Sequence, residues 1–427
     1  MADPLLPRLP AAELVRRRRR SALGDPGVRA AVAQILADVA ERGDEAVRAY
    51  GEQFDGPYAG PPVLGRDALA AARAQAPETL VADLRTVFDR VAAYARRFAP
   101  PADASPRRDE AGYLTGERVV PVARAGAYVP AGTAPLVSSV LMTAGVAAAA
   151  GVPEIWVASP PRGADGVHPA ILAACDVVGV AHVLVAGGAQ AVGALAFGTA
   201  SVHAVDVVAG PGNAYVAEAK RQVFGIVGVD AIAGPSEVVV VADGTADPAL
   251  AAADLLAQAE HDRVAWPVLV SVGEAAGARI VEAVRDQLRS LPRREVAEAA
   301  LQTGAWVVAG SVMEAVEVAG SLAPEHLELY IAEPQRHLDR VAAAGAVFLG
   351  GLPETLGDYV VGPSHVLPTG GAARFSGPLG VGAFQHRIGV IGPPSGPLGA
   401  LGETAVRLAR LEGLEAHARA VEMRLTR

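Results

Sequence analysis

Short apolar segments alternate with helical segments along most of this chain, and this alternation restricts the possible folds more than any other feature. One series contains the apolar segments EIWVAS, HVLVAG and AVDVVAG, separated by HPAILAACDVV and AQAVGALAFG. A second series begins with EVVVVAD at residues 237–243 and continues through VLVSVG, AWVVAG, LELYIA and AGAVFLG. Strands that alternate with helices form right-handed βαβ units around a parallel sheet. The sequence therefore predicts an α/β fold with two parallel sheets.

The remaining segments follow other patterns. Helical periodicity covers residues 28–50 and 80–98, whereas residues 107–130 are β-rich and interrupted by turns. Residues 401–423 predict a helix that is interrupted at Gly413. This tail has too few apolar side chains to form a core of its own, so we expect it to pack on another part of the protein.

Composition and charge argue against several classes of protein. The net charge is −9, and the one dense basic run, residues 16–20, lacks the aromatic residues of a nucleic-acid interface; it is interpreted as a solvated helix face. The most apolar region, residues 135–160, is interrupted by serine, glycine and proline, which argues against a membrane span. The N-terminus lacks the apolar stretch of a signal peptide, and a single cysteine, Cys175, is typical of a reducing compartment. We expect a cytoplasmic protein with no nucleic-acid or membrane partner.

The usual nucleotide-binding fingerprints are missing from both α/β series. The chain contains no G-x-G-x-x-G segment and no Walker-type G-K-S/T segment. A dinucleotide that binds here must do so without the usual glycine turn, which counts against an ordinary Rossmann dehydrogenase.

One polar pair lies near the end of a predicted helix. Asp247 and Pro248 form a strong helix start, and Gln258 and His261 lie three residues apart near the C-terminal end. Histidine is a common metal ligand, and residues at this spacing can share an ion. Taken alone the pair is a weak signal, because such pairs are also common on solvated helix faces.

Two further pairs lie beside predicted strands. Glu325 and His326 immediately precede the apolar strand LELYI, where they could share acid–base work or simply form a capped turn. Asp358 and His365 lie in a turn-rich segment after another strand, and loops that follow parallel strands often carry the sites of α/β proteins.

Other candidates are less distinctive. Glu412 and His417 lie in the tail, where they would ordinarily be part of a charged helix end. Two glycine-rich turns, AGPGN at 209–213 and AGPSE at 233–237, could bring backbone amides close to a phosphate or substrate.

Taken together and in this order, these segments resemble the histidinol dehydrogenase family. The resemblance extends from about residue 28 to the end of the chain, and the combination is specific although each motif alone is not. The matching stretches are AGAYVPAGTA, SSVLM, GGAQAVGALAFGT, GPGNAYVAEAKR, AGPSEVVVVAD, DLLAQAEHD, APEHLEL, GDYVVGPSHVLPTGGAARFSGPLGV and EGLEAHARA.

The resemblance implies a zinc site shared by two subunits of a homodimer. Gln258, His261 and Asp358 would supply three ligands from one chain, and His417 of the other chain would supply the fourth. In this family zinc holds the substrate through its imidazole and amine. A shared site would also explain the tail, because the tail would pack on the partner subunit.

The resemblance also implies roles for the other polar residues. Glu325 and His326 are similar to the family's acid–base pair, and Tyr128, Gln190 and Asn213 match positions that contact NAD. Positions that contact the substrate are matched by Ser236, Gln258, His261, His326, Asp358, His365, Glu412 and His417.

The implied reaction is the four-electron oxidation of L-histidinol, through L-histidinaldehyde, to L-histidine with two NAD, the last step of histidine biosynthesis. His326 would remove the hydroxyl proton in the first oxidation, and Glu325 with His326 would activate water for the second. Holding the aldehyde on zinc would keep it oriented towards the cofactor.

The resemblance implies two incomplete Rossmann-like domains. The first, which would carry the zinc and catalytic residues, combines residues 23–105 and 235–372, and the second, on the NAD side, is residues 126–234. The other parts are an N-terminal arm with a small connecting unit (1–22 and 106–125) and a C-terminal tail swapped in the homodimer (373–427).

The chain departs from the family pattern at three places. Ala131 replaces a glycine after YVP, GVAAAAGV stands where proline and lysine are usual, and RFSGPLGVGAFQHR has glycines where serine or aspartate is commoner. These changes lie on the expected NAD side and in a loop. Two alternatives stay open: a relative that oxidises another polar alcohol or diol with zinc and NAD, and a non-catalytic metal-binding or assembly protein.

Overall fold

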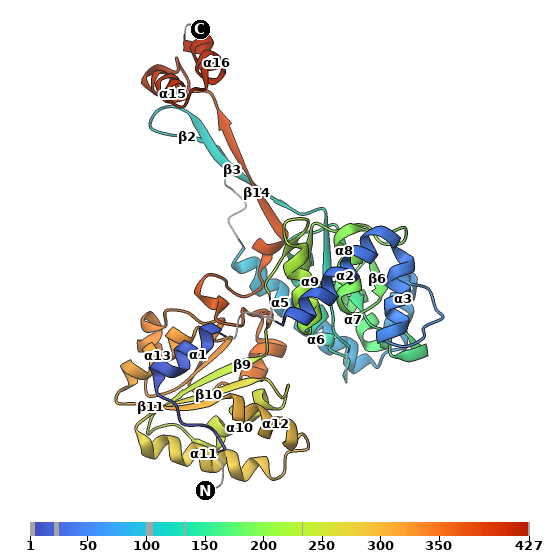
Figure 1. Cartoon of the computed structure of the whole chain (residues 1–427), viewed down its shortest axis with the longest axis vertical. Helices are drawn as coiled ribbons and strands as arrows, with labels where there is room; N and C mark the ends of the chain where they lie inside the picture. Colours follow the sequence, from blue (N-terminus) through green and yellow to red (C-terminus); the bar gives the residue numbers. More distant parts are fainter. Residues whose placement is uncertain (1–4, 21–24, 100–105, 132–133, 233, 426–427) are drawn as a thin grey trace. The chain divides into compact units, whose positions relative to one another are not determined.

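The computed structural model describes residues 5–20, 25–99, 106–131, 134–232 and 234–425. The chain forms two compact units, of which unit 1 comprises residues 1–98 and 122–384 and unit 2 comprises residues 99–121 and 385–427. Unit 1 contains two sheets flanked by helices, and unit 2 contains a small antiparallel sheet and two helices (Figure 1). The predicted α/β class with parallel sheets is confirmed.

The first sheet of unit 1 has the strand order β1-β6-β5-β4-β7-β8. All neighbours are parallel except β1, which pairs antiparallel with β6. Among the parallel strands the chain begins at β4 and moves outward first through β5 and β6 and then through β7 and β8, so the order reverses between β4 and β7. Ligands of open α/β sheets bind beyond the carboxyl ends of the strands at such a reversal. The strands are β1 (Val63–Gly65), β4 (Arg124–Tyr128), β5 (Glu154–Ser159), β6 (His182–Val185), β7 (Val207–Ala209) and β8 (Gly228–Val229).

Among the described residues, eight α-helices surround this sheet. α2 packs on α8 and α9, whereas α4 and α5 pack on α7 and α6. The helices are α2 (Pro26–Arg42), α3 (Asp44–Phe54), α4 (Arg66–Gln75), α5 (Glu78–Arg97), α6 (Val137–Ala149), α7 (Pro169–Val178), α8 (Gly188–Phe197) and α9 (Ala214–Val223).

The position of the N-terminal helices corrects one expectation. Residues 23–105 were expected to join residues 235–372, but Val32, Ile35 and Val39 of α2 are buried in the core of the first sheet, and β1 extends that sheet. The sequence pattern shows that these helices have an apolar face, but it does not show which sheet that face covers.

The second sheet of unit 1 is wholly parallel, with the order β11-β10-β9-β12-β13. Side chains of β9 alternate between two cores, one shared with α10, α11 and α12 and the other with α1 and α13. Every residue of β9 is buried, as expected for a central strand covered on both faces. The strands are β9 (Glu237–Ala242), β10 (Trp266–Val272), β11 (Ala305–Ala309), β12 (His326–Tyr330) and β13 (Ala346–Leu349).

The α-helices in the part of unit 1 that contains this second sheet are α1 (Ala11–Arg20), α10 (Pro248–Ala259), α11 (Glu274–Leu288), α12 (Arg294–Thr303), α13 (Val312–Leu322) and α14 (Glu354–Leu356). Short 3-10 or π helices are η2 (Gly163–Asp165), η3 (Pro334–Arg340), η4 (Gly357–Val361), η5 (Ala372–Arg374) and η6 (Val381–Phe384). The segment before α1 runs beside β11, because Trp306 exchanges backbone hydrogen bonds with Pro7 and Leu9.

Unit 2 brings together segments that are distant in the sequence. β3 (Leu114–Pro121) pairs antiparallel with β14 (Gln385–Gly392) and with β2 (Arg107–Arg108). The expected arm therefore divides, since residues 5–20 belong to unit 1 while β2 and β3 belong to unit 2. The expected tail also divides after residue 384. The sequence could not predict these partners, because strand pairing across more than 250 positions leaves no local signal.

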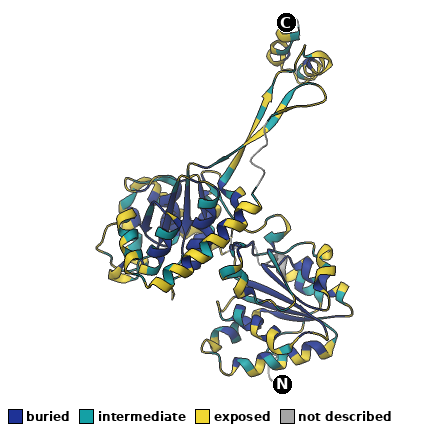
Figure 2. Ribbon diagram, turned by 180° about the vertical axis from the view of Figure 1, so that it is seen from behind, coloured by how far each residue is buried: buried dark blue, intermediate teal, exposed yellow. Residues whose placement is uncertain are grey.

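Two helices complete unit 2, α15 (Gly399–Leu411) and α16 (Glu415–Leu425), and they pack on each other. They bury only Gly402, Val406 and Ala418, and most of their surface is exposed (Figure 2). Leu411 is 82% exposed, so apolar surface remains uncovered within the unit.

Cys175 is fully buried in α7, and burial raises the pKa of its thiol, which is the environment of a structural cysteine. Within the described residues, no helix combines the length and the apolar character needed to cross a membrane.

Candidate active site

A cluster of buried acidic and histidine side chains lies at the amino ends of β9 and β12. α13 ends at Leu322; the next residue, Ala323, adopts the left-handed conformation (φ 48°), and Pro324 follows it. A left-handed residue followed by proline ends a helix sharply. The chain therefore turns directly into β12, whose first residue is His326, beside Glu237 at the start of β9.

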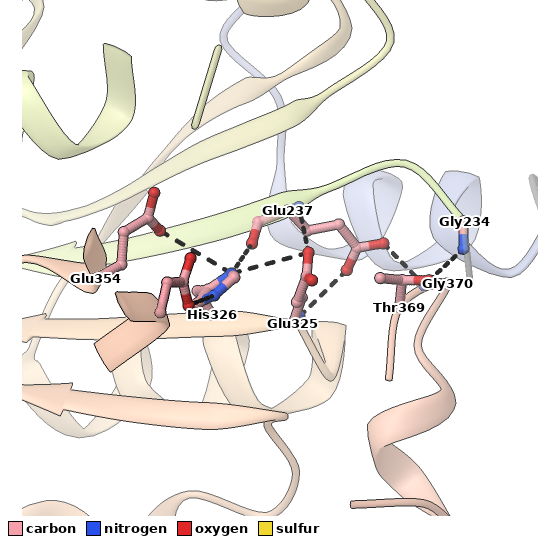
Figure 3. Close-up of polar contacts among 8 residues, drawn as sticks. Gly234, Glu237, Glu325, His326, Glu354, Thr369 and Gly370 are labelled. Atoms are coloured by element: carbon pink, nitrogen blue, oxygen red, sulfur yellow. Dashed lines mark hydrogen bonds and ion pairs between the residues drawn. The ribbon is translucent and has the colours of Figure 1, made fainter. Parts of the chain in front are cut away.

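Glu237 and Glu325 hold each other in place across the two strands. The Glu237 backbone N–H donates to Oε2 of Glu325 (2.9 Å), and the Glu325 N–H donates to Oε2 of Glu237 (3.3 Å). The other Glu237 oxygen accepts a hydrogen bond from the Gly370 N–H (2.8 Å) (Figure 3). Both glutamates are buried, so these bonds fix the Glu325 carboxyl group beside His326.

His326 lies between hydrogen-bond acceptors on both sides of its ring. Nδ1 is 3.1 Å from the Glu237 carbonyl oxygen, and Nε2 is 3.2 Å from Oδ1 of Asp358. Two more carboxylates are close, since Nδ1 lies 3.7 Å from Glu325 and 3.9 Å from Glu354 (Figure 3). Burial alone would lower the pKa of His326, but the surrounding negative charges raise it well above its ordinary value.

The two nearest buried glutamates also have shifted pKa values. Burial raises the pKa of Glu325 to about 7 and that of Glu354 to about 8. A carboxyl group with a pKa near neutrality can either accept or donate a proton under physiological conditions. The cluster therefore combines groups suited to moving protons.

The Asp358 carboxylate interacts electrostatically with three histidine side chains. Burial would raise its pKa, but the hydrogen bond with His326 and the charges of His326, His365 and His261 lower it. Nδ1 of His365 also donates to the Asp358 carbonyl oxygen (3.0 Å). Surrounding protein atoms desolvate His261 and His365 and lower the pKa of both, so each ring keeps a neutral nitrogen lone pair.

The donor set can be compared with the needs of a metal ion. Neutral imidazole and ionised carboxylate are ligands that zinc accepts, so His261 and Asp358 have suitable protonation states. The buried Gln258 amide lies between the Glu237 N–H (2.9 Å) and the Glu354 carboxyl group (3.0 Å). Across the described part of the chain, no cluster of three or more His, Cys, Asp or Glu side chains could hold a metal ion. His261 and Asp358 would therefore need the Gln258 amide and a further donor from elsewhere.

Another group of polar residues lies at the carboxyl ends of the first sheet. Tyr128 ends β4, and its buried hydroxyl accepts a hydrogen bond from the Gly188 N–H (3.0 Å); burial raises its pKa to about 12. Asn213 follows β7 and caps α9, since its side chain accepts hydrogen bonds from the N–H groups of Tyr215 (3.0 Å) and Val216 (3.1 Å). These residues flank the point where the strand order reverses.

The sequence matches the family described as histidinol dehydrogenase over residues 18–425. The chain belongs to the histidinol dehydrogenase family.

Individual relatives match over almost their full length. The chain is 46% identical to histidinol dehydrogenase of Moorella thermoacetica over 98% of this chain and 100% of that protein. It is also 46% identical to the Thermus thermophilus enzyme, over 97% of this chain and 99% of the relative. The crystal structure of histidinol dehydrogenase from Elizabethkingia anophelis has a TM-score of 0.93 at 31% identity and covers 100% of this chain and 99% of that one.

The structure brings six of the family-matched residues together. Gln258, His261, Glu325, His326, Asp358 and His365 gather around the amino ends of β9 and β12. Ser236 immediately precedes Glu237, and its carbonyl accepts a hydrogen bond from the Trp266 N–H (2.9 Å). Glu412 and His417 are exposed residues of unit 2.

Two residues of the cluster were missed by sequence reasoning. Glu237 belonged to a segment quoted for its glycine turn, and a charged residue that opens the otherwise apolar run EVVVVA was the available signal. Glu354 had no comparable signal, because a glutamate in the first turn of a helix is ordinarily a favourable charge at the helix end.

A buried ion pair holds the glycine turn that precedes Asn213. The Lys220 ammonium contacts Asp230 and donates to the Gly210 carbonyl (2.9 Å), while Asp230 accepts from the Gly210 N–H (2.8 Å). Gly210 has φ +116°, and a Cβ there would lie 2.3 Å from the Tyr128 carbonyl oxygen. The turn therefore requires glycine and is held from both sides.

Loss of this ion pair is expected to destabilise the part of unit 1 that is built around the first sheet. Lys220→Met would leave the Asp230 carboxylate buried without its cation, and removing one partner of a buried pair costs about 3–5 kcal/mol. Urea unfolding followed by circular dichroism measures the loss. The double variant Lys220→Met/Asp230→Asn should regain part of the lost free energy of unfolding. A Lys220→Met variant with the same free energy of unfolding as wild type would show that the ion pair does not stabilise the turn.

Proposed function

We propose that the chain oxidises L-histidinol to L-histidine through L-histidinaldehyde, with NAD as the acceptor in both oxidations. The observation that carries the proposal is the buried pair of Glu325 and His326, held by Glu237 and Asp358 in a chain of the histidinol dehydrogenase family. His326 is the base for the substrate hydroxyl proton. Glu325, fixed beside it, takes a proton from the water that adds to the aldehyde.

Four residues are proposed to hold zinc, namely Gln258, His261 and Asp358 of one chain and His417 of its partner in a homodimer. When bound, zinc would anchor the substrate's imidazole and amine, and its positive charge would lower the pKa of His326. Ser236, His365 and Glu412 are proposed to contact the substrate. The exposed α15 and α16, which bury little within unit 2, support a tail that packs on the partner.

Tyr128, Gln190 and Asn213 are proposed to contact NAD at the carboxyl ends of β4 and β7. NAD, when bound, accepts a hydride in each oxidation. Hydrogen bonds hold the buried Tyr128 hydroxyl and the glycine turn before Asn213 in place. The proposed NAD-binding residues are therefore fixed without a G-x-G-x-x-G segment. The single, buried Cys175 supports a reducing, cytoplasmic location.

Purified protein is expected to form two NADH for each L-histidinol, measured by absorbance, with L-histidine as the product. Prolonged chelation should remove this activity and added Zn²⁺ should restore it, because a site of only nitrogen and oxygen ligands holds zinc less tightly than thiolates do. Full activity in protein shown to be metal-free by elemental analysis would contradict the ligand set. Turnover of another amino alcohol or diol in place of L-histidinol would favour the alternative substrate class.

A further inference from the structure

We propose that Asp55 determines cofactor specificity: its carboxylate accepts hydrogen bonds from the adenosine ribose of NAD and excludes the 2′-phosphate of NADP. The inference rests on the proposed NAD-dependent function and adds a residue to it. Asp55 directly follows α3, outside every segment that carries the family resemblance.

The position of Asp55 in the fold supports this role. Asp55 lies beside Gly187, just before α8, and its charge adds to the rise that burial causes in the pKa of the Tyr128 hydroxyl at the end of β4. Pro160, which follows β5, lies on the same side of Gly187, since a Cβ on that glycine would stand 2.8 Å from Pro160 and 3.3 Å from Oδ2 of Asp55. The carboxylate is therefore at the carboxyl ends of β4, β5 and β6.

This is where dinucleotide-binding sheets place an acidic residue. In the usual arrangement the second strand of the unit ends in Asp or Glu, which binds the ribose 2′-hydroxyl. The second strand here is β5, which ends instead in Ser159 and continues into Pro160. Asp55 supplies a carboxylate at this strand end from a different part of the chain.

Unsatisfied polar atoms beside the α8 N-terminus indicate that a ligand binds there. Oδ2 of Asp55 is buried and has no hydrogen-bond partner among the described residues. Gln190 is 1% exposed, and neither of its side-chain amide atoms has a partner within the same described set. Its Oε1 faces Gly188, 2.7 Å from where a Cβ would stand. Leaving such groups unpaired costs about 1–3 kcal/mol each, so polar ligand atoms that pair with them would bind favourably.

The charge of the carboxylate identifies the class of ligand. An ionised carboxylate only accepts hydrogen bonds, so its partner must be a donor such as a ribose hydroxyl. NADP sites instead provide an arginine for the 2′-phosphate. Burial raises the pKa of Asp55, and the Gly187 backbone opposes this rise. A 2′-phosphate placed beside the ionised carboxylate would meet its negative charge.

The test compares Asp55→Asn with wild type using NAD, NADP and the 2′-deoxyadenosine analogue of NAD. Asparagine keeps the size of the side chain and one oxygen but loses the charge and one acceptor. KM for NAD should rise about 10- to 100-fold, the effect of losing a hydrogen bond to a charged group. KM for L-histidinol should stay unchanged, and the preference for NAD over NADP should fall by about tenfold or more. Glu52→Gln, an exposed charge change on the helix that precedes Asp55, is the matched control and should behave as wild type.

The analogue separates a ribose contact from a structural effect. Wild type should use 2′-deoxy-NAD about tenfold less well than NAD, whereas Asp55→Asn should hardly distinguish them. Wild type alone keeps the test decisive if the variant folds poorly, because equal use of NAD, NADP and the deoxy analogue would overturn the proposal. An active wild type with an unchanged variant would overturn the role of Asp55 and leave the proposed function standing. A wild type that does not reduce NAD with L-histidinol would instead remove the proposed function itself.

Discussion

Glu325→Gln is expected to slow oxidation of L-histidinaldehyde by on the order of 10²–10⁴-fold, while oxidation of L-histidinol slows much less. Glutamine has nearly the same shape, and its amide oxygen can still accept the Glu237 N–H bond that fixes residue 325. It cannot accept a proton from water. Because only the second oxidation consumes water, the two half-reactions should separate.

Each half-reaction is measured by supplying the alcohol or the aldehyde and following NADH in a single turnover. His326→Asn serves as the comparison, since His326 is proposed to act in both oxidations and its loss should slow both. Glu333→Gln, an exposed charge change beyond the other end of β12, controls for purification and refolding. Equal losses in both steps for Glu325→Gln would show that Glu325 acts by holding His326, 3.7 Å away, and not by activating water.

The sequence predicted the two parallel sheets because strand and helix patterns are local. It did not predict which sheet α2 and β1 would join, since an amphipathic helix fits any apolar surface of suitable size. The buried α2 side chains and the antiparallel pairing of β1 with β6 settle that question through contacts between distant segments. Local patterns therefore predicted the helices and strands, whereas contacts between distant segments determined which of the two sheets each of them joins.

The sequence alone also did not predict which edge of the second sheet carries the buried cluster. Sites of α/β proteins usually lie at the carboxyl ends of strands, but Glu325 and His326 lie at the amino end of β12. The carboxyl end of β9 is occupied by internal bonds, as Asp243 accepts from the N–H groups of Thr245 (2.8 Å) and Ala332 (2.9 Å). In the sequence, Glu325 and His326 precede the strand segment LELYI. Once the direction of this strand is known, their order in the chain places the pair at its amino end.

Activity is expected to reappear when two inactive variants, His261→Ala and His417→Ala, are unfolded together and refolded. In the proposed homodimer each site combines His261 of one chain with His417 of the other. A mixed dimer then has one site with both lesions and one site built entirely from intact residues. Random pairing makes half of the dimers mixed, so about a quarter of wild-type activity should return.

A second pair of variants makes the result specific. His261→Ala and Asp358→Ala alter the same side of the composite site, so every site of their mixed dimer carries one lesion and no activity should return. Asp358 lies close enough to His261 for each charge to shift the pKa of the other, which supports placing both in one chain's half. If all four ligands came from a single chain, neither mixture would recover. Inactivity of the first mixture, with mixed dimers verified by mass spectrometry, would therefore exclude the swapped tail, because only a ligand donated across the dimer can rebuild an intact site from two damaged chains.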